Sequence, residues 1–551
     1  MGHAPQEHVR STGCTIPEGG RAACPPVSEW ATFTNSGDEA RHTLETVLAN
    51  RLVRRLLGAM TRPGGDGGPS WFERLSEHYH DGSLDPLDRV KWMLPGALID
   101  LAIRLGHADG ERLERELFHH QATVRALTVS ARSIARYGPM QPQRFAAPLL
   151  VVWNITDLCN LSCRHCYQDA GAKRTRVEMT REEKLAAVDE MGRLTLPMLA
   201  IAGGEPLACP DLFPVIERAR MRGIHVTVAS NGTLVTEAMA RRLKQAGVQY
   251  LEISVDSPDA DEHDSFRAQR GSWARAVAGI RNGVKAGLDL GLATCLTNES
   301  VHRVDDLVQL AVDLGCETFS HFNFIPVGRG RDMLVQDLDP KQRERLLIKL
   351  NEHLQRNRLK IISTAPQFGR ACVMYAPPDG IFAQGHGGRA PGAHARVLAR
   401  YIGGCGAGRC YCALEPDGSV TPCVYMRSHV VGNIRDRSLA EIWDNELFAL
   451  LSDRSRRTGH CRVCAFRSYC GGCRARAFAY TGDVTASDPG CIANIGLWNH
   501  LNAQAEDSET ECAWTPDEGR TGAGWQEISA LRFDTAPGSR EGSRQGDERT
   551  G

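Results

Sequence analysis

The chain has 551 residues, with 65 Lys and Arg against 66 Asp and Glu, and 19 cysteines. A formal net charge of −1 excludes a strongly basic nucleic-acid-binding protein and gives no electrostatic reason to bind an anionic membrane. No apolar run approaches the roughly eighteen residues of a membrane span, and no basic-then-apolar signal opens the chain. We therefore expect a cytoplasmic protein, in which cysteines serve metal binding or catalysis more often than disulfides.

The first part of the chain is expected to be helical. Residues 1–38 are mostly polar, with scattered Gly and Pro, and are predicted to be a disordered leader. Residues 39–147 have a helical pattern, because in 41–61, for example, apolar side chains recur every three or four residues. An all-helical N-terminal domain is predicted here, with a role in packing or partner contact.

From 148 to 335, short continuous apolar runs alternate with helical segments. The runs, expected to be strands buried on both faces, are 149–155, 198–202, 224–229, 250–255, 290–296 and 319–325. Six strand-then-helix units predict an α/β fold with a parallel sheet, and a partial (β/α)6 TIM-type barrel is the most economical way to close it. The chemistry of such a barrel lies at the C-terminal ends of its strands.

The remaining chain is predicted to hold one helix and one small domain. Residues 336–402 are expected to form a helix at 340–360 followed by a flexible Gly/Pro/Ala-rich connector. Nine cysteines between 405 and 491 indicate a small cysteine-rich domain over 403–495. Residues 503–551 contain few apolar residues and are predicted to be a disordered tail.

A first cysteine group directly follows the first predicted strand. Cys159, Cys163 and Cys166 have the spacing C-x3-C-x2-C and are followed by Tyr167. Three thiolates suit three corners of a [4Fe–4S] cluster. The fourth iron is then open to an exogenous ligand, which indicates a catalytic site. The alternative is a zinc site completed by His165 or a distant residue.

This loop resembles the signature of the radical S-adenosylmethionine (SAM) superfamily, and Gly203-Gly204-Glu205-Pro206 after the second strand resembles its GGEP motif. The resemblance implies that SAM chelates the open iron through its amino and carboxylate groups. An electron from the reduced cluster then cleaves SAM to methionine and a 5′-deoxyadenosyl radical, which abstracts a substrate hydrogen. Cys159, Cys163 and Cys166 would be the catalytic ligands.

The same resemblance implies SAM contacts at the strand ends. Arg267 would pair with the SAM carboxylate in a charge-assisted contact, although a surface arginine at a helix start is the alternative. The other predicted contacts are Gly203, Gly204 and Glu205 for the amino group, and Ser230, Asn231, Ser254 and Asp256 for the ribose and carboxylate.

A second cysteine group resembles the SPASM extension of radical SAM enzymes. Cys405, Gly418 and Cys423 fit its C-x9–15-G-x4-C pattern, but the gap between Cys470 and Cys473 is one residue shorter than usual. The resemblance implies two auxiliary [4Fe–4S] clusters, whereas a pair of zinc ribbons is the alternative. One cluster would use Cys405, Cys412, Cys423 and Cys473, and the other Cys461, Cys464, Cys470 and Cys491.

One ligand assignment is open at this point. Either Cys410 or Cys412 can be the extra thiol, and Cys412 is preferred because Cys410 is surplus to the family pattern.

The predicted function is that of a radical SAM/SPASM oxidoreductase. Two auxiliary clusters favour a net oxidation, decarboxylation or crosslink over a redox-neutral reaction. SPASM proteins commonly modify peptides, so a peptide side chain or peptide-derived metabolite is the first predicted substrate. The alternatives are tetrapyrrole side-chain processing, because the C-terminal module resembles the haem-biosynthesis branch, and a non-catalytic iron–sulfur electron-transfer protein.

The expected partners follow from this function. They are a peptide or small-molecule substrate and an electron donor such as flavodoxin or ferredoxin, without nucleic acid or membrane. Substrate identity, the bond changed and the oligomeric state do not follow from the sequence.

Overall fold

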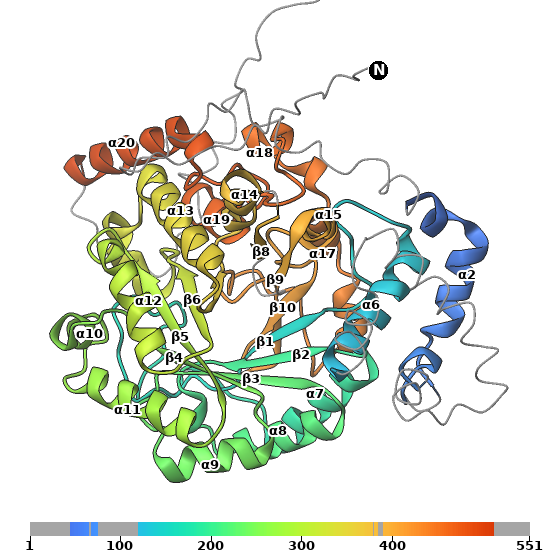
Figure 1. The fold of residues 1–551 in the computed structure, drawn as a ribbon, viewed down its shortest axis with the longest axis horizontal. Helices are drawn as coiled ribbons and strands as arrows, with labels where there is room; N and C mark the ends of the chain where they lie inside the picture. Colours follow the sequence, from blue (N-terminus) through green and yellow to red (C-terminus); the bar gives the residue numbers. More distant parts are fainter. Residues whose placement is uncertain (1–44, 65–67, 75–119, 378, 384–388, 512–551) are drawn as a thin grey trace, which may run out of the picture.

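The computed structural model describes residues 45–64, 68–74, 120–377, 379–383 and 389–511 (Figure 1). The predicted leader, most of the predicted tail and the middle of the predicted N-terminal domain lie outside these residues. None of the helices in the described ranges combines the length and apolar character needed to cross a bilayer.

A ten-stranded sheet forms the core, in the order β12-β11-β10-β1-β2-β3-β4-β5-β6-β7. All neighbours from β10 to β7 are parallel, whereas β10, β11 and β12 pair antiparallel. The strands are β1 Leu150–Asn154, β2 Met198–Ala202, β3 His225–Ser230, β4 Tyr250–Ser254, β5 Asp289–Leu296, β6 Thr318–Asn323, β7 Lys360–Ser363, β10 Tyr411–Leu414, β11 Ser419–Thr421 and β12 Gly432–Asn433. The α/β class and all six predicted barrel strands are confirmed.

Helices cover the outside of this sheet, as Figure 1 shows for α7 to α12. Their apolar faces are buried against the strands, and several begin with strong caps: Thr180 and Glu183 form a capping box on α7, and Asp339 caps α13 ahead of Pro340. The barrel helices are α7 Arg181–Arg193, α8 Leu212–Met221, α9 Glu237–Ala246, α10 Ala260–Phe266, α11 Ser272–Lys285, α12 Val304–Asp313 and α13 Pro340–Arg356, with a 3-10 segment η5 at Gly328–Gln336.

The C-terminal module is joined to the barrel by its sheet. β10 pairs in parallel with β1, so that Leu150 lies opposite Tyr411. This pairing was not predicted, because nothing near Tyr411 in the sequence indicates a partner as distant as Leu150. The helices of the module are α16 Leu439–Trp443, α17 Glu446–Ser452, α18 Gly459–Val463, α19 Arg474–Thr481 and α20 Ile495–Glu511.

Three boundaries differ from the predictions. The predicted helix 340–360 ends at Arg356 because Lys360 already begins β7. The helix α14 Gln367–Tyr375 precedes the predicted flexible connector. The connector itself contains β8 Ile381–Ala383, β9 Arg389–Pro391 and α15 Gly392–Ile402. The tail predicted to be disordered from 503 is helical up to Glu511, where α20 ends, and the rest of it lies outside the described residues.

The described N-terminal helices pack on the barrel. α2 Arg51–Met60 lies against α6 Gln121–Tyr137. Arg125 Nε of α6 donates to Leu196 O at 2.9 Å, in the turn that leads into β2. Arg125 Nη2 also donates to Gly192 O of α7 at 3.2 Å, so these donors fix α6 beside α7.

Candidate functional site

The first cysteine group lies on a loop at the C-terminal end of β1, and its backbone is held from two sides. Cys159 N donates to Gly171 O at 2.7 Å. From η5, Arg329 N donates to Cys166 O at 3.0 Å, and Arg329 Nε donates to Cys163 O at 2.9 Å. Arg329, which the sequence analysis missed, thus positions two of the three cysteines.

The two motif glycines pack directly on this loop. A Cβ on Gly203, whose φ is +136°, would lie 2.8 Å from Thr156 O, and one on Gly204 would lie 2.2 Å from Leu158 O. Glu205 N also donates to Leu158 O at 2.7 Å. Only glycine permits such close backbone approach, so this motif couples the end of β2 to the cysteine loop.

Glu205 links the ends of β2 and β3. Its fully buried carboxylate accepts hydrogen bonds from Ser230 Oγ at 2.9 Å, Asn231 N at 2.8 Å and Leu207 N at 3.1 Å. Burial raises the pKa of Glu205 above its ordinary value, against the effect of these donors. The carboxylate of Glu205 therefore joins the end of β2 to the end of β3.

Asp256 and Arg267 form a buried ion pair beyond the end of β4, of which Ser254 is the last residue. Arg267 Nε lies 2.7 Å from Asp256 Oδ2, and Cys295 N donates to Asp256 Oδ1 at 2.9 Å. Burial opposes the ionisation of Asp256, but the Arg267 charge outweighs it and lowers the pKa to about 2. The alternative that Arg267 is a surface arginine is wrong, because its side chain is 9% exposed.

Two residues that follow strand ends interact with the cysteine loop: Asn231 after β3 and Arg267 beyond β4. Asn231 Nδ2 donates to Asn160 Oδ1 at 2.8 Å. Burial raises the pKa of the Cys163 thiol, while the positive charge of Arg267 acts in the opposite direction. Of the predicted SAM-contact residues, Gly203, Gly204, Glu205 and Asn231 contact the cysteine loop or the residues that lead into it.

Three cysteines of the second group lie in one apolar cluster. Cys405, Cys423 and Cys473 pack there with Tyr411 and with Ile325, which follows β6. Tyr411 Oη donates a hydrogen bond to Cys423 Sγ at 2.8 Å. Segments more than sixty residues apart in the module are thus brought to one place beside the barrel.

A second set of four cysteines lies nearby around α18. Burial raises the pKa of the Cys491 thiol well above its ordinary value, and the charges of Cys470 and Cys461 raise it further. Burial, followed by the charge of Cys461, likewise raises the pKa of Cys464. Gly472 lies against two of these sulfurs, because its N donates to Cys470 Sγ at 3.4 Å and a Cβ on it would lie 3.0 Å from Cys461 Sγ.

Cys412 and Cys410 have different surroundings. Cys412 is fully buried within β10, against apolar side chains that include Ala187 and Met191 of α7. Neighbouring strand residues face opposite sides of a sheet, so Cys412 faces away from Tyr411. Cys410 lies on the turn that begins at Cys405, where a Cβ on Gly406 would lie 2.5 Å from its Sγ. These positions speak against the predicted ligand Cys412.

Two tyrosines join the cysteine groups. Tyr167 follows Cys166, Tyr425 lies two residues after Cys423, and their rings meet edge to face with centroids 5.1 Å apart. The aromatic residue after Cys166 was part of the predicted motif, whereas no sequence signal singles out Tyr425.

The buried carboxylate of Glu415 is linked to Tyr167 through Asn154. Asn154 Nδ2 donates to Glu415 Oε1 at 3.0 Å, and Tyr167 Oη donates to Asn154 Oδ1 at 3.1 Å. Arg427 Nε and Arg176 Nη1 lie 3.3 and 3.7 Å from Glu415 Oε2. Burial outweighs the charge of Arg176 and the hydrogen bond from Asn154, and it raises the pKa of Glu415 to about 7.

The donor sets fit iron–sulfur clusters. All predicted ligands are free thiols, and thiolate sulfur is the usual ligand of such clusters. Among the described residues, no three His, Cys, Asp or Glu side chains converge on a position for a single metal ion. Cys372, by contrast, is fully buried in the apolar core on α14.

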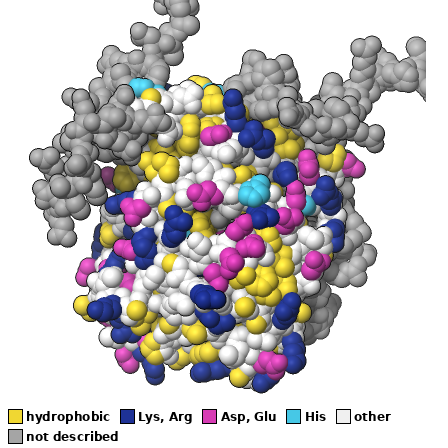
Figure 2. All heavy atoms as spheres, turned by 90° about the vertical axis from the view of Figure 1, so that its left-hand side faces the viewer, with side chains coloured by type: hydrophobic (Ala, Val, Ile, Leu, Met, Phe, Trp, Pro, Cys, Tyr) yellow, Lys and Arg dark blue, Asp and Glu magenta, His cyan; other side chains and the backbone are white. Residues whose placement is uncertain are grey.

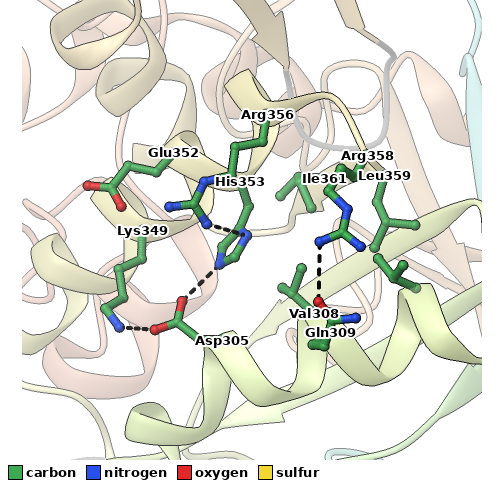
Figure 3. Close-up of a pocket in the computed structure, with 11 residues that line it drawn as sticks. Asp305, Val308, Gln309, Lys349, Glu352, His353, Arg356, Arg358, Leu359 and Ile361 are labelled. Carbon is green, nitrogen blue, oxygen red and sulfur yellow. Dashed lines mark hydrogen bonds and ion pairs between the residues drawn. The ribbon is translucent and has the colours of Figure 1, made fainter.

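A groove of about 370 Å³ lies elsewhere, between α12 and α13 (Figure 3). His353 Nε2 lies 2.8 Å from Asp305 Oδ1, and Lys349 also pairs with Asp305. None of the predicted ligand or SAM-contact residues is among its lining residues. The surface in Figure 2 shows basic and acidic side chains interspersed, in keeping with the balanced charge of the chain.

Comparisons with known proteins agree with this geometry. The model of the radical SAM superfamily matches residues 153–311, and that of SPASM, an iron–sulfur cluster-binding domain, matches residues 405–465. The chain belongs to the radical SAM superfamily and carries a SPASM domain. It is a radical SAM enzyme whose cofactors are [4Fe–4S] clusters and SAM.

Several relatives can be named. An AdoMet-dependent heme synthase of Methanosarcina barkeri is 33% identical over 64% of this chain and 98% of its own length. A pre-heme d1 synthase of Dinoroseobacter shibae is 30% identical over 64% and 89%. The mycofactocin maturase MftC of Mycobacterium ulcerans is 29% identical over 64% and 89%.

Among solved structures, Streptococcus suis SuiB bound to S-adenosylmethionine superposes with a TM-score of 0.52 at 17% identity, covering 67% of this chain and 82% of that one. At this identity the likeness concerns the fold alone.

Proposed function

We propose that this radical SAM enzyme oxidises a side chain of a tetrapyrrole. The observation that carries this proposal is the match to the heme synthase, which spans 98% of that relative at 33% identity. The pre-heme d1 synthase supports the same substrate class at 30% identity. This order reverses the sequence-based preference for a peptide, because the peptide-directed relatives are less similar.

Three ligand sets are proposed. The first loop provides Cys159, Cys163 and Cys166 for the cluster that meets SAM. When bound, the clusters and SAM supply a 5′-deoxyadenosyl radical and an acceptor for one electron. The auxiliary sets are Cys405, Cys410, Cys423 and Cys473, and Cys461, Cys464, Cys470 and Cys491. Cys410 replaces Cys412 in the first of these sets, because the Cys412 side chain lies in the apolar contact with α7.

The neighbouring residues are proposed to hold SAM. Arg267 keeps guanidinium N–H groups beyond the one that meets Asp256, and these suit a carboxylate. Backbone groups of Gly203, Gly204 and Glu205 would meet the amino group. Ser230, Asn231 and Ser254 would line the ribose.

Asp256 would orient Arg267 for this contact. Their bond is short and both side chains are buried, so the guanidinium has little freedom to turn. Burial of the surrounding strand ends also excludes water from the site.

A peptide is the second candidate substrate. MftC, a mycofactocin maturase, is 29% identical over 357 residues and supports modification of a peptide or peptide-derived metabolite. Both candidates use the same cysteine sets, so the cysteines themselves do not distinguish them.

A flavodoxin or ferredoxin is proposed as the electron donor, in the cytoplasm. Arg456, Arg462 and Arg467 are exposed on both sides of Cys461 and Cys464. Positive charge at this surface would favour an acidic partner. Binding should weaken as salt rises, because exposed charges are screened.

Substrate class can be tested by incubating the anaerobically loaded enzyme, SAM and a reductant with a propionate-bearing tetrapyrrole or with a candidate precursor peptide. We expect 5′-deoxyadenosine together with a mass change in the tetrapyrrole. A mass change confined to the peptide would refute the proposal in favour of the second candidate. The Cys163→Ala chain is the control for chemistry that does not depend on SAM cleavage.

The assignment of Cys410 in place of Cys412 as a cluster ligand can be tested by iron analysis. Cys410→Ala should lose about four of roughly twelve irons, the content of three cubane clusters, whereas Cys412→Ala should keep them. Cys412→Ala should instead cost about 1–2 kcal/mol of folding free energy, because it opens a small cavity. Iron loss confined to Cys412→Ala would restore the original assignment.

A further inference from the structure

The hydroxyl of Tyr411 contacts a cysteine sulfur. Tyr411 Oη donates to Cys423 Sγ at 2.8 Å. Tyr411 begins β10 and Cys423 follows β11, and these two strands pair antiparallel. The register of these two strands therefore brings the start of β10 beside the bend that follows β11.

This donor differs from several others that reach proposed ligand sulfurs. They include Leu161 N on Cys159, Gly472 N on Cys470 and Arg476 N on Cys473, each at 3.4 Å, and Asn231 Nδ2 on Cys159 and Asn494 Nδ2 on Cys461, each at 3.9 Å. The Tyr411 contact is shorter than these. It can also be removed by replacing one side chain with another of the same shape.

We propose that the Tyr411 hydroxyl raises the reduction potential of the auxiliary cluster that Cys423 would ligate. This inference rests on the ligand set proposed above. One-electron reduction adds negative charge that is shared with the ligand sulfurs, and an O–H donor stabilises that charge. Hydrogen bonds to sulfur are among the determinants of cluster potential. No proton is transferred, and the electron comes from the external reductant.

Tyr411 lies at the auxiliary site that faces the first cysteine loop, so a change in cluster potential there would affect electron acceptance. Tyr411 and Cys423 lie in the apolar cluster that also includes Tyr425, and Tyr425 meets Tyr167 of the first cysteine loop. The hydroxyl thus acts on the auxiliary site that faces the catalytic loop. A higher potential would make that site a better electron acceptor during a net oxidation.

The test is a potentiometric titration of the loaded, full-length chain, followed by electron paramagnetic resonance (EPR). Tyr411→Phe should lower the one-electron reduction equilibrium constant of one auxiliary cluster about tenfold, which is about 59 mV. The cluster of the first loop, recognised by the change in its spectrum on adding SAM, should keep its potential.

Tyr250→Phe is the matched control. Tyr250 begins β4, outside the C-terminal module, and its hydroxyl donates to Glu252 Oε1 at 3.3 Å and not to sulfur. It should leave all potentials unchanged. Equal potentials in the wild type and Tyr411→Phe, at equal iron content, would overturn the inference.

A second substitution guards against poor cluster loading in Tyr411→Phe. Tyr411→3,5-difluorotyrosine keeps the ring and makes the hydroxyl a stronger donor, so the same potential should rise. A fall or no change would count against the inference.

Failure of the underlying ligand assignment has its own signature. If Cys423→Ala retains all of its iron, the proposed ligand set is wrong. If Cys423→Ala loses about four irons while Tyr411→Phe shifts no potential, the ligand set stands and the role of Tyr411 falls.

Discussion

The two cysteine groups are built in opposite ways. The first occupies residues 159–166 of one loop, and its local spacing already places three thiols together. The first auxiliary set draws on Cys405, Cys423 and Cys473, which meet only because β10, β11 and α19 pack beside the barrel. The geometry of the first group therefore depends on the residues that pack against its loop. The geometry of the second group depends on the fold of the whole C-terminal module.

The supports of the two groups differ accordingly. The cysteine loop is held by close backbone contacts with Gly203 and Gly204. The dispersed group is held by a buried ionic network: Cys473 N donates to Asp488 Oδ2 at 2.8 Å, and Arg476 Nη1 lies 3.6 Å from Asp488 Oδ1. Substitutions at the glycines that pack on the cysteine loop should thus disable the first site alone. Substitutions in the buried ionic network should destabilise the second.

The largest effect is expected from Cys163→Ala. Loss of one of three ligands should abolish SAM cleavage while roughly eight of twelve irons remain in the auxiliary sets. The measurements are 5′-deoxyadenosine production and iron content of the anaerobically loaded chain. Retained cleavage would mean that the two groups are not independent in the way proposed.

Gly204→Ala should disable the first group without touching its cysteines. The new Cβ would lie 2.2 Å from Leu158 O, so the loop has to move. We expect the dissociation constant for SAM to rise at least about tenfold, or about 1.4 kcal/mol, with unchanged auxiliary EPR signals. Gly171→Ala is the control, because a Cβ there would meet no atom within 4 Å. Equal SAM affinity in both variants would contradict the packing argument.

Arg476→Met should destabilise the second group. Arg476 is fully buried, and its Nε lies 3.4 Å from Asp337 Oδ2, so its loss leaves Asp337 and Asp488 without this cation. Breaking such a buried pair costs about 3–5 kcal/mol, to be measured by urea unfolding of the loaded chain. Arg435→Met, which breaks an exposed pair with Glu183, should cost less than about 1 kcal/mol. Similar costs for both would refute the structural role of the network.

The last expected effect concerns pH at the contact between the groups. The pKa of Glu415 is raised to about 7 by burial, above the unfolded value of about 4.3. The folded state therefore holds the proton more tightly, and this stability is present in full below about pH 4.3 and is lost as pH rises to about 7.

Glu415→Gln should remove about 1–3 kcal/mol of that pH dependence, measured by unfolding between pH 5.5 and 8. Glu317→Gln, at an exposed carboxylate paired with Lys360, should leave the dependence as in the wild type. An unchanged slope in Glu415→Gln would show that Glu415 is ionised in the folded protein.

Much of the barrel could be predicted because its signal is local. The six continuous apolar runs became strands, and the cysteine loop and the glycine motif lie at strand ends as predicted. The prediction of a flexible connector before 403 was wrong over β8, β9 and α15. Its Gly and Pro residues resemble a loop, although β8 and β9 pair with each other. Tyr425 and Arg329 carry no local signal, because their roles arise from the segments that they contact.

The sequence by itself determined the chemistry of this protein: the spacing of Cys159, Cys163 and Cys166, the glycine motif and the cysteine-rich extension indicate a radical SAM/SPASM enzyme. Only the tertiary structure decided how Cys410, Tyr411 and Cys412 face. Strand residues alternate between the two sides of a sheet, and the side that becomes the interior depends on the pairing of β10 with β1. That pairing turns Tyr411 toward Cys423 and Cys412 toward α7, which no spacing of cysteines can reveal.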